Sequence, residues 1–297
     1  MNAYPLRVTN PAGRRLMTVP DAANPGSHLR GGEFYSPIQA RLRTGEVVLS
    51  ELCQPCSRSV PRHQHELAYV TVVLRGDYLE GDRGRLDELR PLTAVFNPAG
   101  IEHSTVIGPA GASFFTIELC EANLRHLGVS LPRSTTFDRG VGAMLWPGLH
   151  LYSAFKTETA DPLVLDAYVL ELLGAIAGFE VRDKAAPSWF GRVKERLHEG
   201  FREPLRMSDL AREAGVHPVH LARVFRKMER RTPGEYQQRL QVRSACDLLR
   251  DPEWTLAMIA AECGFADQSH FTRIFRRMTG TTPARFRQAV ALKKITA

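Results

Sequence analysis

The chain has 297 residues, 43% of them hydrophobic and 24% charged, which is long enough for two ordinary domains and excludes a largely disordered protein. No apolar run reaches the roughly 18 residues of a membrane-spanning helix and the first residues lack a signal-peptide core, so we expect a cytoplasmic protein without a membrane partner. From residue 189 onward 21 Lys and Arg oppose 12 Asp and Glu, a net charge of +9 against −2 for the rest, which favours nucleic acid as a partner.

Four apolar runs rich in Val, Leu, Ile and Phe stand in the first half of the chain. They cover residues 46–52, 67–76, 92–100 and 113–119. Because the intervening stretches at 76–85 and 107–112 carry Gly, Asp and Pro, we interpret them as turns between strands. The pattern predicts an antiparallel β-barrel or sandwich.

The chain has five cysteines, an odd number that suits a reducing compartment in a chain too large to need disulfides. Cys53 and Cys56 have the C-x-x-C spacing of redox motifs. Two interpretations remain open, a redox pair or two small thiols beside a strand end.

Three histidines lie near the predicted strands in a pattern that favours a common site. His63 and His65 are two residues apart and therefore share one face of a strand. With His103, which follows a Pro-Ala-Gly turn, they could hold a divalent transition metal. The alternative is a metal-free pocket in which the histidines make hydrogen bonds to a small effector or serve structural roles.

These histidine segments, residues 61–78 and 96–104, resemble the two halves of the cupin pattern. The resemblance implies a small β-barrel with an effector site at His63, His65, Tyr69 and His103. The glutamate of the cupin pattern is absent, because Tyr69 and Val70 stand four and five residues after His65.

The apolar period changes to that of a helix at residues 161–178. Asp161 can cap the first turn, Pro162 suits the first helical position, and later leucines and valines form a wide apolar face. We expect this helix to pack on the barrel or to pair with a second subunit in a homodimer. The polar run that follows predicts a first domain at 1–180, a linker at 181–188 and a second domain at 189–297.

The second domain contains an internal repeat, residues 210–236 and 259–286. The matching pairs are Ala211 and Ala260, Gly215 and Gly264, Arg223 and Arg273, Phe225 and Phe275, Arg226 and Arg276, Met228 and Met278, Thr232 and Thr282, and Pro233 and Pro283. Each copy has the pattern of a short helix, a glycine-containing turn and a second helix, so we predict an all-α domain with two helix-turn-helix units.

The second helix of each copy has an apolar stripe and an opposite polar face. The polar residues are His220, Arg223, Arg226 and Lys227 in the first copy and Gln268, Ser269, Thr272, Arg273, Arg276 and Arg277 in the second. Arginine can read guanine, glutamine can read adenine, and both faces can bind phosphates. The alternative is a solvated face on a small helical bundle.

Residues 234–250, between the copies, have the pattern of one helix of roughly 25 Å. We interpret it as a rigid spacer that could direct two recognition helices to successive major grooves, about 34 Å apart.

The last 109 residues resemble the DNA-binding domain of the AraC/XylS family of bacterial transcription regulators, through the repeat, its spacing and the terminal Thr-Pro-x-x-Phe. The resemblance implies that residues 217–228 form the first recognition helix. It adds His217, Val219 and Ala222 to the DNA-binding residues, with Val219 and Ala222 limited to thymine methyl groups.

We therefore predict a DNA-binding transcription regulator, not an enzyme, that binds promoter DNA through two recognition helices. A small-molecule effector in an N-terminal cupin-like barrel with flanking helices modulates it, no cofactor is required, and RNA polymerase is an expected partner. Two alternatives remain, a metal-dependent cupin enzyme (oxygenase or isomerase) with accessory DNA binding and an architectural DNA protein without a ligand.

Overall fold

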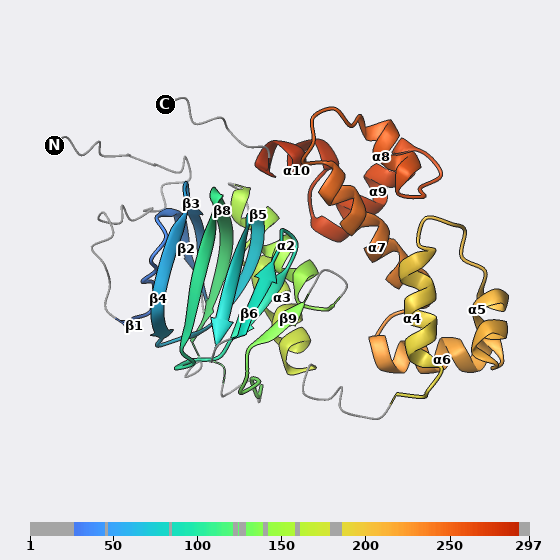
Figure 1. The fold of residues 1–297 in the computed structure, drawn as a ribbon, viewed down its shortest axis with the longest axis horizontal. Coiled ribbons are helices and arrows are strands. Elements are labelled where there is room, and N and C mark those ends of the chain that lie inside the picture. Colours follow the sequence, from blue (N-terminus) through green and yellow to red (C-terminus); the bar gives the residue numbers. More distant parts are fainter. Residues whose placement is uncertain are drawn as a thin grey trace. The chain divides into compact units, whose positions relative to one another are not determined.

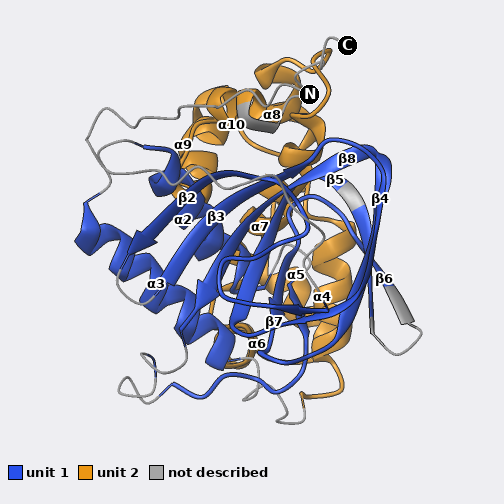
Figure 2. Ribbon diagram, turned by 90° about the vertical axis from the view of Figure 1, so that its left-hand side faces the viewer, with its two compact units in different colours: residues 1–179 blue, residues 180–297 orange. Residues whose placement is uncertain are grey.

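The computed structural model describes residues 27–44, 47–82, 85–120, 124, 129–138, 142–157, 161–178 and 186–290. The chain divides into two compact units, residues 1–179 and 180–297 (Figure 2). The first is β-rich and the second is helical (Figure 1), so the predicted order of a β domain and then an all-α domain is confirmed. Most of the predicted linker, residues 181–185, lies outside the described residues, as does the N-terminal segment 1–26.

The described strands of the N-terminal unit belong to one sheet, in the order β1-β4-β8-β5-β7-β9, with β3 also paired to β8, β2 to β3 and β6 to β5. The strands are β1 (His28–Leu29), β2 (Ile38–Thr44), β3 (Val47–Gln54), β4 (Arg58–His65), β5 (Ala68–Asp82), β6 (Arg85–Leu89), β7 (Ala94–Asn97), β8 (His103–Leu119) and β9 (Thr136–Asp138). The pairings are antiparallel except that of β1 with β4.

The long strands β5 and β8 bend where two glycines meet. Gly76 and Gly111 both have left-handed backbone angles, φ 75° and 69°, and a Cβ on Gly76 would lie 2.0 Å from the carbonyl oxygen of Gly111. Only glycine allows this approach, and the register of β5 against β8 shifts at the same place. Residues from both halves of each strand line one cavity, so the sheet folds over its own interior.

The interpretation of residues 76–85 and 107–112 as turns is therefore wrong for most of their length. Residues 76–82 continue β5 and residues 107–112 lie within β8. Their glycines bend a continuous strand, as at the corner of a small barrel.

The described residues of this unit also form the helices α2 (Leu145–Lys156) and α3 (Pro162–Ala177). The buried carboxylate of Asp138 accepts hydrogen bonds from the backbone N–H groups of Met144 and Leu145 and so fixes the start of α2. Helix α3 begins as expected, because Asp161 accepts from the Leu163 N–H and Pro162 follows. No helix of the described residues is both long and apolar enough to cross a bilayer.

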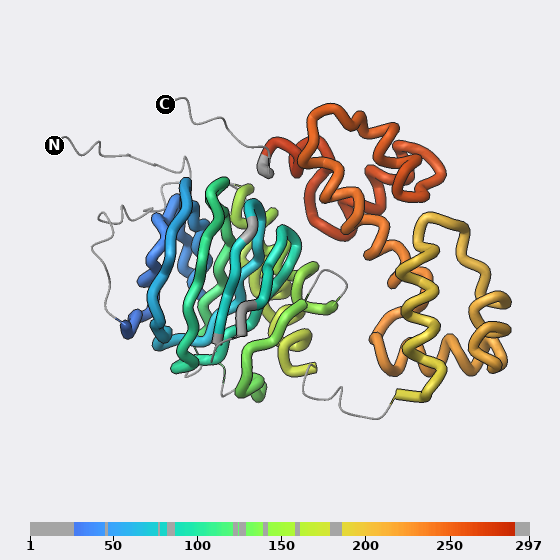
Figure 3. The backbone as a smooth tube through the Cα atoms, in the orientation of Figure 1, coloured from blue at the N-terminus to red at the C-terminus, as the bar shows by residue number. Residues whose placement is uncertain are grey.

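The C-terminal unit consists of helices whose path is followed in Figure 3. They are α4 (Phe190–Glu199), α5 (Met207–Ala214), α6 (Pro218–Glu229), α7 (Pro233–Leu248), α8 (Leu256–Glu262), α9 (Gln268–Thr279) and α10 (Pro283–Val290). The two helix-turn-helix units are α5 with α6 and α8 with α9. Gly215 and Gly264, which end the first helix of each unit, have φ 68° and 78°, as expected for left-handed C-terminal caps.

Helix α7 is more than a spacer, because it is the common core of both halves. Its buried residues face in several directions, and it packs against α4, α6, α8 and α9. The amide of Gln241 donates to the carbonyl oxygens of Phe201 at 3.0 Å and Gly264 at 3.2 Å, which ties the loop after α4 to the second unit.

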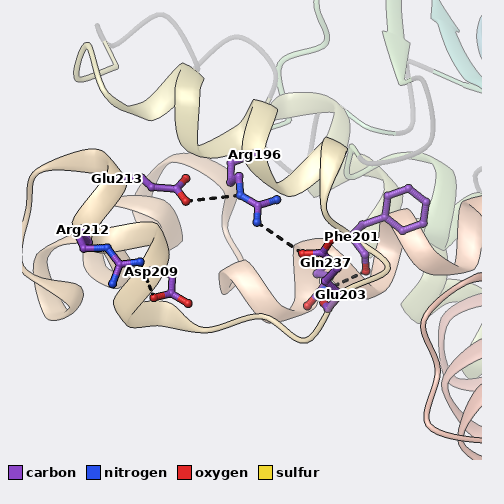
Figure 4. A network of polar contacts seen from close by, with 7 residues as sticks. All are labelled: Arg196, Phe201, Glu203, Asp209, Arg212, Glu213 and Gln237. Atoms are coloured by element: carbon purple, nitrogen blue, oxygen red, sulfur yellow. Dashed lines mark hydrogen bonds and ion pairs between the residues drawn. The ribbon is translucent and has the colours of Figure 1, made fainter.

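The same loop is held from the first half as well (Figure 4). Gln237 donates to the Phe201 and Glu203 carbonyl oxygens, and Arg196 on α4 makes ion pairs with Glu203 and with Glu213 on α5. Side chains of α7 and α4 thus tie the loop after α4 to both helix-turn-helix units.

Candidate nucleic-acid interface and ligand cavity

The first recognition surface, defined as the polar face of α6 and its cap, is accessible. The buried residues of α6 are Leu221, Phe225 and Glu229. The predicted residues His217, Val219, His220, Arg223, Arg226 and Lys227 are exposed, and Ala222 is half-buried. Val219 in the first turn is 69% exposed, so its methyl groups are open to contact from outside the unit.

The second recognition surface, the polar face of α9, is equally accessible. Phe271, Ile274 and Phe275 are buried beneath it. Gln268, Ser269, Arg273, Arg276 and Arg277 are exposed and Thr272 is half-buried. These six side chains and Thr282 line one groove of about 680 Å³.

The residues of these surfaces are not equally free to contact a ligand. Arg277 donates to the Gln238 side chain on α7 at 2.6 Å, which orients its guanidinium, whereas Arg223 lies 3.4 Å from His220 Nδ1 on its own helix. Thr282 was missed in the sequence, because its place beside α9 depends on the turn that leads into α10. Its hydroxyl caps that helix by accepting from the Arg285 N–H.

The three predicted histidines come together inside the N-terminal unit. His63 and His65 lie on β4, and His103 is the residue paired with His63 at the start of β8. All three side chains are buried, and their nearest ring nitrogens lie within 4.8 Å of one another. The alternation of a strand accounts for this meeting, as predicted, because His63 and His65 face the same side.

A cavity of about 80 Å³ lies beside these histidines. Tyr69, predicted to belong to the site, lines it, and so do Tyr78, Glu80 and Thr116, which were missed in the sequence. In the sequence, the one signal for Glu80 is its spacing of two residues from Tyr78, which places both side chains on the same face of a strand.

A directed hydrogen-bond network closes one side of the cavity. Asn97 on β7 accepts from the Thr135 hydroxyl through Oδ1, so its amide nitrogen faces Glu80 at 2.9 Å and Tyr69 Oη at 3.1 Å. Since Asn97 donates to Tyr69, the phenol proton is available for His103 Nε2, 3.0 Å away. Tyr69 therefore occupies the lone pair of one of the three histidines.

Burial sets the charges in this site. It lowers the pKa of His63 to about 4 and of His65 to about 2, with the neighbouring His103 adding to both shifts, so these imidazoles are neutral at pH 7. Burial raises the pKa of Glu80, and burial with the nearby Glu80 raises that of Tyr69, which stays a phenol. The donor set of neutral imidazoles is one that transition metals accept.

Comparison with known proteins supports the interpretation of the C-terminal unit. Residues 210–289 match the helix-turn-helix domain family. The HTH-type transcriptional activator RhaR of Mannheimia succiniciproducens is 24% identical over 119 residues, which are 39% of this chain and 43% of RhaR. The uncharacterized HTH-type transcriptional regulator YfiF of Bacillus subtilis is 25% identical over 227 residues, 69% of this chain and 71% of YfiF.

The match with RhaR thus spans less than half of that relative's length. Among solved structures, ToxT of Vibrio cholerae resembles 82% of this chain and is covered over 97% of its own, at 11% identity and a TM-score of 0.36. The C-terminal unit contains a helix-turn-helix domain, as its repeat predicts.

Proposed function

We propose that this protein is a transcription regulator that binds promoter DNA through α6 and α9 and is modulated by a small ligand in the cavity of its N-terminal unit. One observation carries the proposal. Two helices with exposed polar faces are fixed to the same central helix, α7, in a part of the chain with a net charge of +9.

The two recognition surfaces offer different chemistry to DNA. On α9, Gln268 and Arg273 can make paired hydrogen bonds to adenine and guanine, and Arg276 can neutralise a phosphate. On α6, the exposed Val219 can contact thymine methyl groups, and Arg223 can read guanine. We therefore expect a site with two unlike halves on one side of the duplex.

The N-terminal unit supplies the proposed sensor and a surface for a second subunit. Helix α3 exposes Leu163 by 75% and Leu170 by 55%, which supports a homodimer through this helix. Contact with RNA polymerase belongs to the same proposal. A cavity of about 80 Å³ suits a small ligand rather than the bulky substrate of an enzyme.

Substitution of Arg273 tests the DNA-binding surface. Arg273→Ala should reduce specific affinity by about 1–3 kcal/mol and relax base preference at one position, measured by selection from random DNA and by titration at fixed salt. Arg192→Ala is the matched control, since it removes one exposed positive charge from α4 in the same unit. Equal effects of the two substitutions would show that Arg273 does not read a base.

Salt dependence gives a second readout. If Arg276 contacts a phosphate, Arg276→Ala should weaken binding to all sequences alike and reduce the slope of log K against log salt by about 0.9. Binding that does not depend on salt would contradict the proposal for the whole C-terminal unit.

A further inference from the structure

The histidine cluster presents ring nitrogens that are already oriented for a ligand. His63 Nδ1 lies 2.8 Å from the carbonyl oxygen of Pro61, and His103 Nδ1 lies 3.4 Å from that of Ile101. A carbonyl oxygen only accepts, so each Nδ1 carries the proton and each Nε2 keeps its lone pair. Such bonds to the far nitrogen are the usual support of metal-bound histidines. The His65 ring forms no hydrogen bond to any of the described residues, although its backbone carbonyl oxygen accepts from the Gly100 N–H.

The cavity itself favours a cation. None of the described residues that line it is Lys or Arg, so no permanent positive charge there matches a carboxylate or phosphate. Its lining offers the imidazole nitrogens, the Glu80 carboxyl group and several Ser, Thr and Tyr hydroxyls, all of which carry lone pairs for a cation or its water. Thr116 is 1% exposed, and its hydroxyl has no hydrogen-bond partner in the described part of the chain, which leaves one further polar atom for a ligand or its water.

Size distinguishes a metal ion from an organic effector. A cavity of about 80 Å³ holds an ion with a few waters, since one water needs roughly 10–15 Å³ on this measure, whereas pockets for organic ligands usually exceed about 300 Å³. The fit needs a small inward rotation of the rings. Two nitrogens on one ion are at most about 4.2 Å apart, and these lie within 4.8 Å.

We infer that His63, His65 and His103 bind one divalent transition-metal ion and that the Tyr69 hydroxyl competes with it for His103 Nε2. Imidazole selects zinc, copper, nickel or iron over magnesium or calcium, which prefer oxygen. The Tyr69 bond must break before the third histidine can bind the ion. The inference that the site binds metal does not depend on the proposed function. Only the further idea that the metal is the regulatory signal rests on the proposed function.

The alternative is that the rings are structural. His63 packs edge-on against Tyr35, and His65 lies near Phe34, with ring centroids 4.9 and 5.5 Å apart, as in an aromatic core. A purely structural cluster has no reason to bind metal in a fixed ratio, and the stoichiometry therefore decides between the two readings.

The test uses the full chain, purified without a histidine tag and stripped with a chelator. Titration with Zn²⁺ against a fluorescent indicator, and with Co²⁺ by visible absorption, should give one equivalent. His65→Ala and His63→Gln should each weaken binding more than about tenfold. His28→Ala, at an exposed histidine of the same unit, and a Cys53→Ser/Cys56→Ser variant should leave it unchanged. Less than a tenth of an equivalent, or loss in the cysteine variant, overturns the site.

Tyr69→Phe tests the competition. Loss of one hydrogen bond of about 0.5–1.5 kcal/mol from the metal-free state should tighten Zn²⁺ binding about two- to tenfold. Unchanged or weaker binding, in a variant whose thermal unfolding shows that it is folded, would mean that Tyr69 does not block His103.

Specific DNA binding by the same preparations separates the two proposals. Protein that binds DNA but no metal overturns this inference and leaves the proposed function standing. Protein that binds one metal ion but no DNA does the reverse.

Discussion

Two glycines at matching positions of the repeat should respond very differently to an added methyl group. Gly215 and Gly264 both end the first helix of a helix-turn-helix unit in the left-handed region. Alanine there costs about 1–2 kcal/mol from its backbone conformation alone. This part of the cost is common to both substitutions, so the difference between them reports the surroundings.

Those surroundings differ. A Cβ at Gly215 would meet no atom of the described residues within 4 Å, whereas at Gly264 it would lie 2.2 Å from the carbonyl oxygen of Arg202. The backbone must move, and Gln241 holds both sides of the contact through the Phe201 and Gly264 carbonyl oxygens. Losing those two bonds adds about 1–3 kcal/mol. Gly264→Ala should therefore lower the free energy of unfolding by about 2–5 kcal/mol and Gly215→Ala by about 1–2, with the larger loss in Gly264→Ala.

Urea unfolding of the full chain, followed by far-ultraviolet circular dichroism, measures both values. The slopes of the transitions must agree for the midpoints to be compared. An equal fall in the free energy of unfolding in the two variants would refute the reasoning. It would mean that the loop after α4 can shift without loss of stability and that α7 does not fix its position. Specific DNA affinity of Gly215→Ala should be unchanged where the variant is folded.

Two further predictions concern α7 and its neighbours. Thr232→Ala removes the capping box in which the Thr232 hydroxyl accepts from the Glu235 N–H at 3.2 Å. We expect the free energy of unfolding, measured in urea, to fall by about 1 kcal/mol, and Thr232→Ser should keep most of that stability. His198 lies 2.9 Å from the Tyr236 hydroxyl, and burial lowers its pKa below the ordinary 6.5. The neutral ring therefore stabilises the folded state fully above pH 6.5, and this contribution is lost as the pH falls through the folded-state pKa, because the unfolded chain binds the proton first. His198→Gln should flatten the fall of the urea midpoint from roughly pH 7 to pH 5, and an unchanged slope would contradict the assignment.

The features that could be predicted from sequence are those that a local period determines. The first recognition helix, expected at residues 217–228, lies at Pro218–Glu229, and the polar residues assigned to the second copy fall within Gln268–Thr279. Both could be placed because Phe225 and Phe275 recur with their arginines at fixed helical offsets. The spacing of His63 and His65 placed both side chains on one face of a strand. In each case the physical cause, the geometry of a helix or a strand, acts over a few residues.

What could not be predicted depends on contacts between distant parts of the chain. In the sequence, Gly76 and Gly111 have the pattern of turn residues. Their role in bending the sheet depends on their close approach between β5 and β8, which the sequence does not indicate. Helix α7 has the composition of a spacer, yet neighbours on several sides bury Gln237 and Gln241. The Asn97 network likewise joins β7, β5 and residue 135, which no local pattern connects.

The repeat is symmetric in its core and asymmetric on its surface, and this difference bears on function. Phe225 and Phe275 occupy equivalent buried positions, so the two units have the same support. Their outer faces share Arg223 with Arg273 and Arg226 with Arg276 but differ in the first turn, where the apolar Val219 of α6 corresponds to the polar Ser269 of α9. Equal supports hold both helices on α7, and in the proposed function the unlike first turns would let each helix contact a different sequence. A single chain can thus define the direction of its site on DNA, which a symmetric pair of identical helices cannot do.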